Sequence, residues 1–148
     1  MTHGRADRAA ELHAQGANCA QSVVCAFAES LGADGQAMMR AATGFGGGMG
    51  RLASTCGAVT GAFMALGLAH GMRTPGEAEA KEKTYADVRE FARRFAAKNG
   101  NLACRDLLGV DIGTPEGHTR AREQKLIATR CPGFILDAVA ILEEMLGA

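Results

Sequence analysis

Five cysteines are the residues of this 148-residue chain best suited to chemistry. Cys19, Cys56, Cys104 and Cys131 each fall where, or just after, a helix is predicted to begin. A helix N-terminus presents unpaired N–H groups and a partial positive charge, and both favour a thiolate over a thiol. The thiolate is the form that binds metals and attacks disulfides. This repeated placement predicts that these four cysteines carry the function.

Cys25 is expected to differ from the other four. It follows Cys19 by six residues, which is about 240° around a helix that turns about 100° per residue. The two side chains therefore cannot share a face. Cys25 stands between Val24 and Ala26, and free cysteine is among the most buried residue types. We therefore expect Cys25 to pack in the core.

The four remaining cysteines allow three uses. Thiolates are ligands of zinc and of iron–sulfur clusters, so the four could form a metal site. Two of them could instead cycle between dithiol and disulfide. All could also simply pack. The chain contains no C-x-x-C pair, so the ligands would have to converge from distant points, and spacing alone does not choose between these uses.

The composition predicts helices as the elements that position these cysteines. Alanine, leucine and methionine dominate, while the chain has no tryptophan and only one tyrosine. That mixture favours helices over sheets. No segment alternates with a period of two, and no internal repeat is present. We expect a single all-α domain over residues 1–148, a helical bundle of about six to eight helices.

Caps and stop signals set the expected boundaries. Asn18 and Gln21 form a capping box, Asp34 and Thr55 are further caps, and Thr74 precedes a proline. Apolar residues at helical spacing follow each start. The predicted helices span residues 5–15, 19–31, 35–42, 56–70, 75–98, 102–108, 115–127 and 131–146.

The helix over 56–70 is unusual in its small residues. Gly57 and Gly61 lie one turn apart on one face. A face without side chains lets another backbone come close, so this helix is expected at the centre of the bundle.

A glycine-rich run over residues 44–50 separates two predicted helices. It does not fit the G-x-G-x-x-G spacing of dinucleotide sites, and no strand precedes it. Its N–H groups could still hold an anion or hydrogen-bond a thiolate or a cluster sulfur. Candidate cofactor-binding residues are Gly46, Gly47, Gly48 and Arg51. Arg51 and Arg105 lie near candidate cysteines and could stabilise thiolates or be ordinary surface residues.

The histidines give weaker signals. His70 ends a predicted helix, where a capping role is expected rather than metal ligation. His118 is expected to be solvated in a loop over 117–120, and His3 and His13 lie near the N-terminus.

Charge and hydropathy exclude some classes of partner. Sixteen basic residues balance sixteen acidic ones, so no net field favours nucleic acid or an anionic membrane. The first 17 residues do not resemble a secretory signal, and the weakly polar run over 57–69 is too short to span a bilayer. We expect a cytoplasmic protein, in which thiols are normally reduced.

Four separated blocks, in order, resemble the C_GCAxxG_C_C family, which is named for its spaced cysteines. The blocks are Asn18-Cys19-Ala20-Gln21, the glycine-rich run with Arg51, Cys56-Gly57-Ala58-Val59-Thr60-Gly61-Ala62 and Cys104-Arg105-Asp106-Leu107-Leu108-Gly109, followed by Cys131. The third block departs from the family pattern, because its cysteine stands before the glycine rather than after it.

This resemblance implies an all-helical, homodimeric, redox-active protein whose functional set is Cys19, Cys56, Cys104 and Cys131. A related domain in some multihaem cytochromes accompanies an iron–sulfur centre. The leading hypothesis is therefore an iron–sulfur cluster, or else a metal such as zinc, held by these four thiolates, with an unknown electron-transfer partner. The alternatives are a metal-free thiol–disulfide oxidoreductase or redox sensor, and a structural or partner-binding bundle whose cysteines pack.

Overall fold

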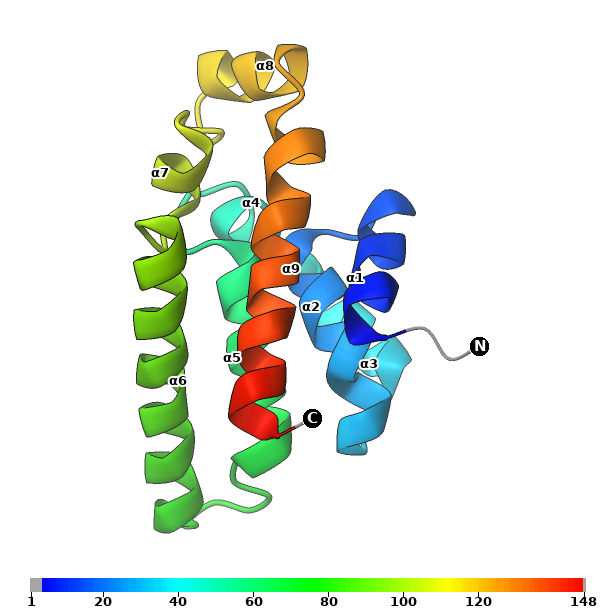
Figure 1. Ribbon diagram of the computed structural model, residues 1–148, viewed down its shortest axis with the longest axis vertical. Helices are drawn as coiled ribbons and strands as arrows, with labels where there is room; N and C mark the ends of the chain where they lie inside the picture. Colours follow the sequence, from blue (N-terminus) through cyan, green and yellow to red (C-terminus); the bar gives the residue numbers. More distant parts are fainter. Residues whose placement is uncertain (1–3, 148) are drawn as a thin grey trace.

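The computed structural model describes residues 4–147 and confirms an all-α bundle without strands in that range (Figure 1). The predicted His3 lies outside the described residues. The described part has nine α-helices and two short 3₁₀ turns, at Glu29–Leu31 and Thr43–Phe45. The α-helices are α1 (Arg5–Ala14), α2 (Cys19–Ala28), α3 (Gly35–Ala41), α4 (Gly46–Met49), α5 (Gly57–His70), α6 (Ala78–Asn99), α7 (Cys104–Leu108), α8 (Pro115–Glu123) and α9 (Leu126–Leu146).

Helix α5 lies in the middle of the bundle, between α2 and α6 and against α9 (Figure 1). The expected smooth face is used against α2. A Cβ on Gly61 would lie 2.6 Å from the carbonyl oxygen of Ala20, and one on Gly57 would lie 2.9 Å from the Ala20 nitrogen. Only glycine permits this approach. The backbones of α2 and α5 therefore run close together, as the sequence predicted.

The long helices α6 and α9 close the other side of the core. Phe91 and Phe95 of α6 are fully buried. Their rings continue an aromatic ladder from Phe63 of α5 to Phe134 of α9, with centroids 6.0–6.4 Å apart. These pairs combine burial of large apolar surface with favourable ring geometry. The ladder packs α9 against α6 and, through α6, against α5.

Two predicted helix boundaries are wrong. Helix α6 begins at Ala78 rather than at Pro75. The Glu77 carboxylate accepts hydrogen bonds from the backbone N–H groups of Arg73 and Thr74, at 2.9 and 2.7 Å. These bonds to preceding residues stabilise a turn at Thr74-Pro75, where the helix was expected to start.

The last helix begins five residues earlier than predicted, at Leu126 rather than at Cys131. Lys125 adopts a left-handed conformation at φ 54°, which ends α8 and precedes α9. Pro132 therefore lies inside α9, where its missing N–H removes one helical hydrogen bond. Burial of Leu126, Cys131 and Ile135 on the same helix outweighs that cost. Cys131 consequently lies within a helix and not at its start.

The glycine-rich run forms a left-handed turn at α4. All five residues from Gly47 to Arg51 have φ between 59° and 70°. The turn is closed by hydrogen bonds from the N–H groups of Gly50 and Arg51 to the carbonyl of Gly46. Left-handed backbone costs a non-glycine residue about 1–2 kcal/mol, so glycine at three of the five positions makes the turn feasible. The sequence predicted a break here but not this turn.

Within residues 4–147, no helix combines the length and the apolar character needed to cross a bilayer.

Candidate functional site

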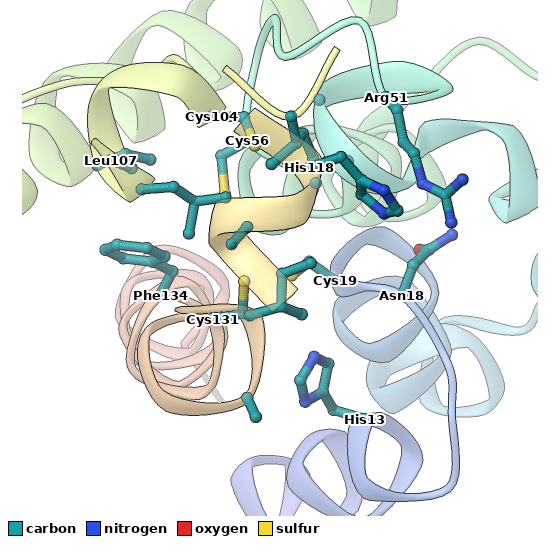
Figure 2. A pocket seen from close by; sticks show the side chains of 18 of the residues that line it. His13, Asn18, Cys19, Arg51, Cys56, Cys104, Leu107, His118, Cys131 and Phe134 are labelled. Atoms are coloured by element: carbon teal, nitrogen blue, oxygen red, sulfur yellow. The ribbon is translucent and has the colours of Figure 1, made fainter. Parts of the chain in front are cut away.

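Four of the five cysteines line one cavity of about 570 Å³ near the end of the bundle where α7 and α8 lie (Figures 1 and 2). Three of the four are buried and Cys19 is partly buried. They come from widely separated segments of the chain, as the sequence required. The four are Cys19, Cys56, Cys104 and Cys131.

Cys25 lies away from this cavity. It packs partly buried against a separate apolar cluster and its Sγ contacts the Gly35 carbonyl oxygen at 3.8 Å. Its position on the other side of α2 follows the helical geometry predicted from its spacing to Cys19.

The capping box at Asn18 positions Cys19. The Asn18 side chain accepts a hydrogen bond from the Gln21 N–H, and the Gln21 side chain accepts one from the Asn18 N–H, both at 2.9 Å. Asn18 also donates to the Thr43 carbonyl at 3.0 Å, just before the left-handed turn. Cys19 is thereby fixed as the first residue of α2.

An isolated β-bridge holds Cys56 beside Cys104. Thr55 pairs antiparallel with Ala103. On either side of that pair, the Cys56 N–H donates to the Leu102 carbonyl at 2.8 Å, and the Cys104 N–H donates to the Ser54 carbonyl at 2.6 Å. The predicted cap Thr55 is replaced in that role by Cys56, which is the N-cap of α5. Cys104 is the first residue of α7.

Cys131 reaches the cavity from the second turn of α9. The neighbouring Arg130 donates from its guanidinium to the Leu108 carbonyl at 3.0 Å and to the Leu107 carbonyl at 3.5 Å. These bonds satisfy carbonyls at the end of α7 and tie α9 to the helix that carries Cys104. The prediction that Cys131 gains from a helix N-terminus is wrong, because α9 begins five residues earlier.

Cys19 and Cys131 lie next to each other in the cavity, and Figure 2 shows their side chains together in the middle of the site. The hydrogen bond between their side chains lowers the pKa of Cys131, although burial opposes that change. The same bond and burial raise the pKa of Cys19 well above its usual range. Of the four cavity cysteines, Cys131 is the one whose pKa is lowered.

Cys56 and Cys104 are held in the protonated form near neutral pH. Burial raises the pKa of Cys56 to about 11, against weaker opposing bonds from the N–H groups of Ala58 and Val59. Burial also raises the pKa of Cys104 to about 12, and the nearby charges of Cys56 and Cys131 add to the effect. Placement at a helix start is therefore outweighed by desolvation at both residues.

The predicted glycine-loop residues lie partly at the cavity. Gly47, Gly48 and Arg51 line it, whereas Gly46 packs against Asn18, with 2.7 Å between its hypothetical Cβ and the Asn18 Nδ2. Arg105 does not line the cavity. Its Nε donates to the Ala53 carbonyl at 3.2 Å, at the end of the left-handed turn.

The cavity also holds four basic residues to which the sequence assigned no functional role. Two of them, His13 of α1 and His118 of α8, were expected only near the N-terminus and in a solvated loop. The other two, Arg122 of α8 and Lys125 at the α8–α9 junction, were not considered. His118 lies in α8 rather than in the expected loop. It precedes Arg122 by four residues, so the two share a helix face, which is a sequence signal that could have linked them.

The four thiols are suitable ligands for a metal or a cluster, but they do not lie close enough together to hold one. Four thiols facing one cavity are a soft-ligand set of the kind that zinc and iron–sulfur clusters take. However, among residues 4–147 no three histidine, cysteine or acidic side chains are grouped so that they could hold a metal ion. His70, where capping was expected, instead has its Nδ1 2.9 Å from Asp87 Oδ2, and neither residue lines this cavity.

Comparison with known proteins agrees with the cysteine pattern. No curated protein and no solved structure matches the chain significantly. Over residues 17–145 the chain matches the family described as "Putative redox-active protein (C_GCAxxG_C_C)". The matched range holds all four cavity cysteines, the left-handed turn and the β-bridge. The chain therefore belongs to the C_GCAxxG_C_C family.

Proposed function

We propose that this protein is a thiol–disulfide redox protein whose working pair is Cys19 and Cys131. The observation that carries the proposal is that the two side chains lie next to each other in the cavity, where the pKa of Cys131 is lowered and the pKa of Cys19 is raised. Disulfide exchange requires one thiol that attacks and a second that resolves the mixed disulfide. Cys131, with its lowered pKa, suits the first role, and the protonated Cys19 beside it suits the second.

The exchange proceeds in two balanced steps. The Cys131 thiolate attacks one sulfur of a disulfide R–S–S–R, forming a mixed disulfide with Cys131 and releasing one R–S⁻. Cys19 then loses its proton to the released thiolate or to solvent and attacks Cys131 Sγ. The Cys19–Cys131 disulfide forms and the second R–S⁻ leaves. The protein dithiol is oxidised by two electrons and the disulfide is reduced to two thiols.

A four-thiolate cofactor site is a second proposal, supported by the convergence of Cys19, Cys56, Cys104 and Cys131 on one cavity. An iron–sulfur cluster bound there would supply one-electron transfer, and zinc would supply a structural or Lewis-acid centre. The four side chains would have to draw closer than they are, since no three of them, within the described range, are grouped for a metal. For that reason the dithiol proposal comes first.

Peptide mapping separates the two proposals. The chain is purified without oxygen and analysed for iron, zinc and acid-labile sulfide, and its absorption spectrum is recorded. It is then oxidised with diamide and digested. The dithiol proposal expects a Cys19–Cys131 cross-linked peptide in a metal-free protein, lost in Cys19→Ser and Cys131→Ser and retained in Cys25→Ser. A reduced protein that forms no such cross-link contradicts it.

The second proposal has its own signature in the same experiment. It expects stoichiometric metal, with sulfide and visible bands if the metal is iron, which is lost when any of the four cavity cysteines is replaced by serine and kept in Cys25→Ser. Metal retained in all four variants contradicts it.

The expected homodimer, cytoplasmic location and electron-transfer partner remain predictions from the sequence. Light scattering coupled to size exclusion tests the first of these directly, on both the reduced and the oxidised protein.

A further inference from the structure

The cavity is lined by basic groups and by no acidic one. Its lining includes Arg51, Arg122 and Lys125, and no aspartate or glutamate from residues 4–147. Asp111 acts electrostatically on Cys104 but does not line the cavity. The chain as a whole has no net charge, so this is a local concentration of positive charge and not a consequence of composition.

The three cations have no carboxylate partner in the described part of the chain. The ion pairs found there involve other residues, mostly on α6, and none of them includes Arg51, Arg122 or Lys125. All three are exposed. Their charge is therefore available to a molecule that enters the cavity.

Two of these cations stand on strained backbone. Four non-glycine residues in the described range have a positive φ, and two of the four are Arg51 at 63° and Lys125 at 54°. Left-handed backbone is unfavourable for any residue with a Cβ, and strained residues of this kind cluster at functional sites. Arg51 lies on the left-handed turn and Lys125 at the α8–α9 junction, so two separate segments of the cavity wall each carry a cation on left-handed backbone.

The histidines and the apolar wall complete the surroundings of the sulfurs. Figure 2 shows Arg51 and His118 on one side of the cysteines and His13 on another. Burial lowers the pKa of His13, which favours its uncharged form. Leu107, with Phe134, gives the cavity an apolar wall.

The size of the cavity limits what can enter. About 570 Å³ is within the range of small-molecule sites, which is roughly 300–1,000 Å³. Cys56, Cys104 and Cys131 are no more than 7% exposed. A folded protein cannot bring its own disulfide to such sulfurs, whereas a molecule of a few residues' size can.

We infer that the cavity selects anionic low-molecular-weight disulfides, with carboxylates held by Arg51, Arg122 and Lys125 and the S–S bond presented to Cys131. The inference rests on the proposed dithiol function and names its substrate class. One-sided charge around a cleft raises association rates of opposite charges by about 10–10³-fold, and added salt screens the effect.

The test compares three disulfides of similar size and different charge: 3,3′-dithiodipropionate (a dianion), bis(2-hydroxyethyl) disulfide (neutral) and cystamine (a dication). Oxidation of the reduced full-length protein is followed by quenching and mass spectrometry. Each rate is divided by the rate of the same disulfide with the urea-unfolded chain, which removes differences between the leaving thiols.

The expected result at low salt is a preference of at least about tenfold for the dianion over the dication. It should fall to near one in R51Q/R122Q/K125Q and at high salt. The control R40Q/R73Q/R89Q removes three exposed charges outside the cavity and should keep the preference. Equal normalised rates in the wild type, or an unchanged preference in R51Q/R122Q/K125Q, would overturn the inference.

A non-reactive anion separates this inference from the redox proposal. Protection of Cys131 from iodoacetamide is measured with the dianionic thioether 3,3′-thiodipropionate and the neutral thiodiethanol. Protection by the dianion alone supports anion selection, even if none of the disulfides oxidises the protein, an outcome that would contradict only the dithiol function. Absence of protection by the dianion contradicts anion selection.

Discussion

Gly61 of α5 and Ala20 of α2 pack backbone against backbone, so that a Cβ on Gly61 would lie 2.6 Å from the Ala20 carbonyl oxygen. Cys19 precedes Ala20, and Cys56 lies just before the first turn of α5. The close approach of the two helices therefore sets the distance between two of the cavity cysteines. Packing, and not only local sequence, determines whether these thiols share a site.

Gly61→Ala is expected to destabilise the protein by about 2 kcal/mol. The new methyl group meets main-chain atoms that cannot move aside, and this cost exceeds the gain of about 1 kcal/mol from the better helix former. Gly67→Ala is the matched control on the same helix, because nothing lies within 4 Å of its hypothetical Cβ. Urea unfolding should show Gly67→Ala to be neutral or stabilising. Equal stability of the two variants would contradict the close packing.

Asn18→Ala is expected to cost about 1 kcal/mol and to slow formation of the Cys19–Cys131 disulfide. The substitution removes the capping box and the bond to Thr43 that fix Cys19. Asp34→Ala removes another helix cap, from α3, which contributes no residue to the cavity. It should lose similar stability and keep the wild-type oxidation rate. Mass spectrometry of diamide-treated samples, together with urea unfolding, checks both expectations.

The local signals of the sequence predicted most of the fold. The capping box, the Asp34 cap and the glycine stops after α2 and α7 all lie where expected, because each depends on residues within one turn. The central place of α5 was also predictable. Gly57 and Gly61 leave one face of the helix without side chains, and such a face allows another backbone to come close.

The remaining features depend on tertiary context. Pro132 suggested a helix start, but packing of residues on both sides of it carried α9 through the proline. The left-handed turn could not be predicted, because it requires Met49 and Arg51 to adopt the same backbone as their glycine neighbours. The elevated pKa values of Cys56 and Cys104 come from burial, which sequence position does not reveal.

Gly48→Ala is expected to destabilise the protein by more than about 2 kcal/mol and to disturb the cavity wall. Its φ is 69°, and a Cβ would lie 2.5 Å from the Ser54 nitrogen, so strain and overlap add. Gly44→Ala is the control from the same run, with an open position and no positive φ. Thermal unfolding and the anion preference of the cavity should both change in Gly48→Ala alone. Similar effects in the two variants would mean that the turn is not as described.

The Cys19–Cys131 hydrogen bond predicts how thiol reactivity depends on pH. A group whose pKa is lowered in the folded protein is ionised from a lower pH upwards, so Cys131 should be alkylated by iodoacetamide with a midpoint below that of an ordinary cysteine. Cys19→Ala removes the donor and leaves burial, which raises the pKa. The midpoint of Cys131 should therefore move upward in that variant and remain unchanged in Cys25→Ala. Site-resolved mass spectrometry across a pH series measures both midpoints. An unchanged midpoint in Cys19→Ala would show that Cys131 does not depend on Cys19, and the dithiol assignment would lose its main support.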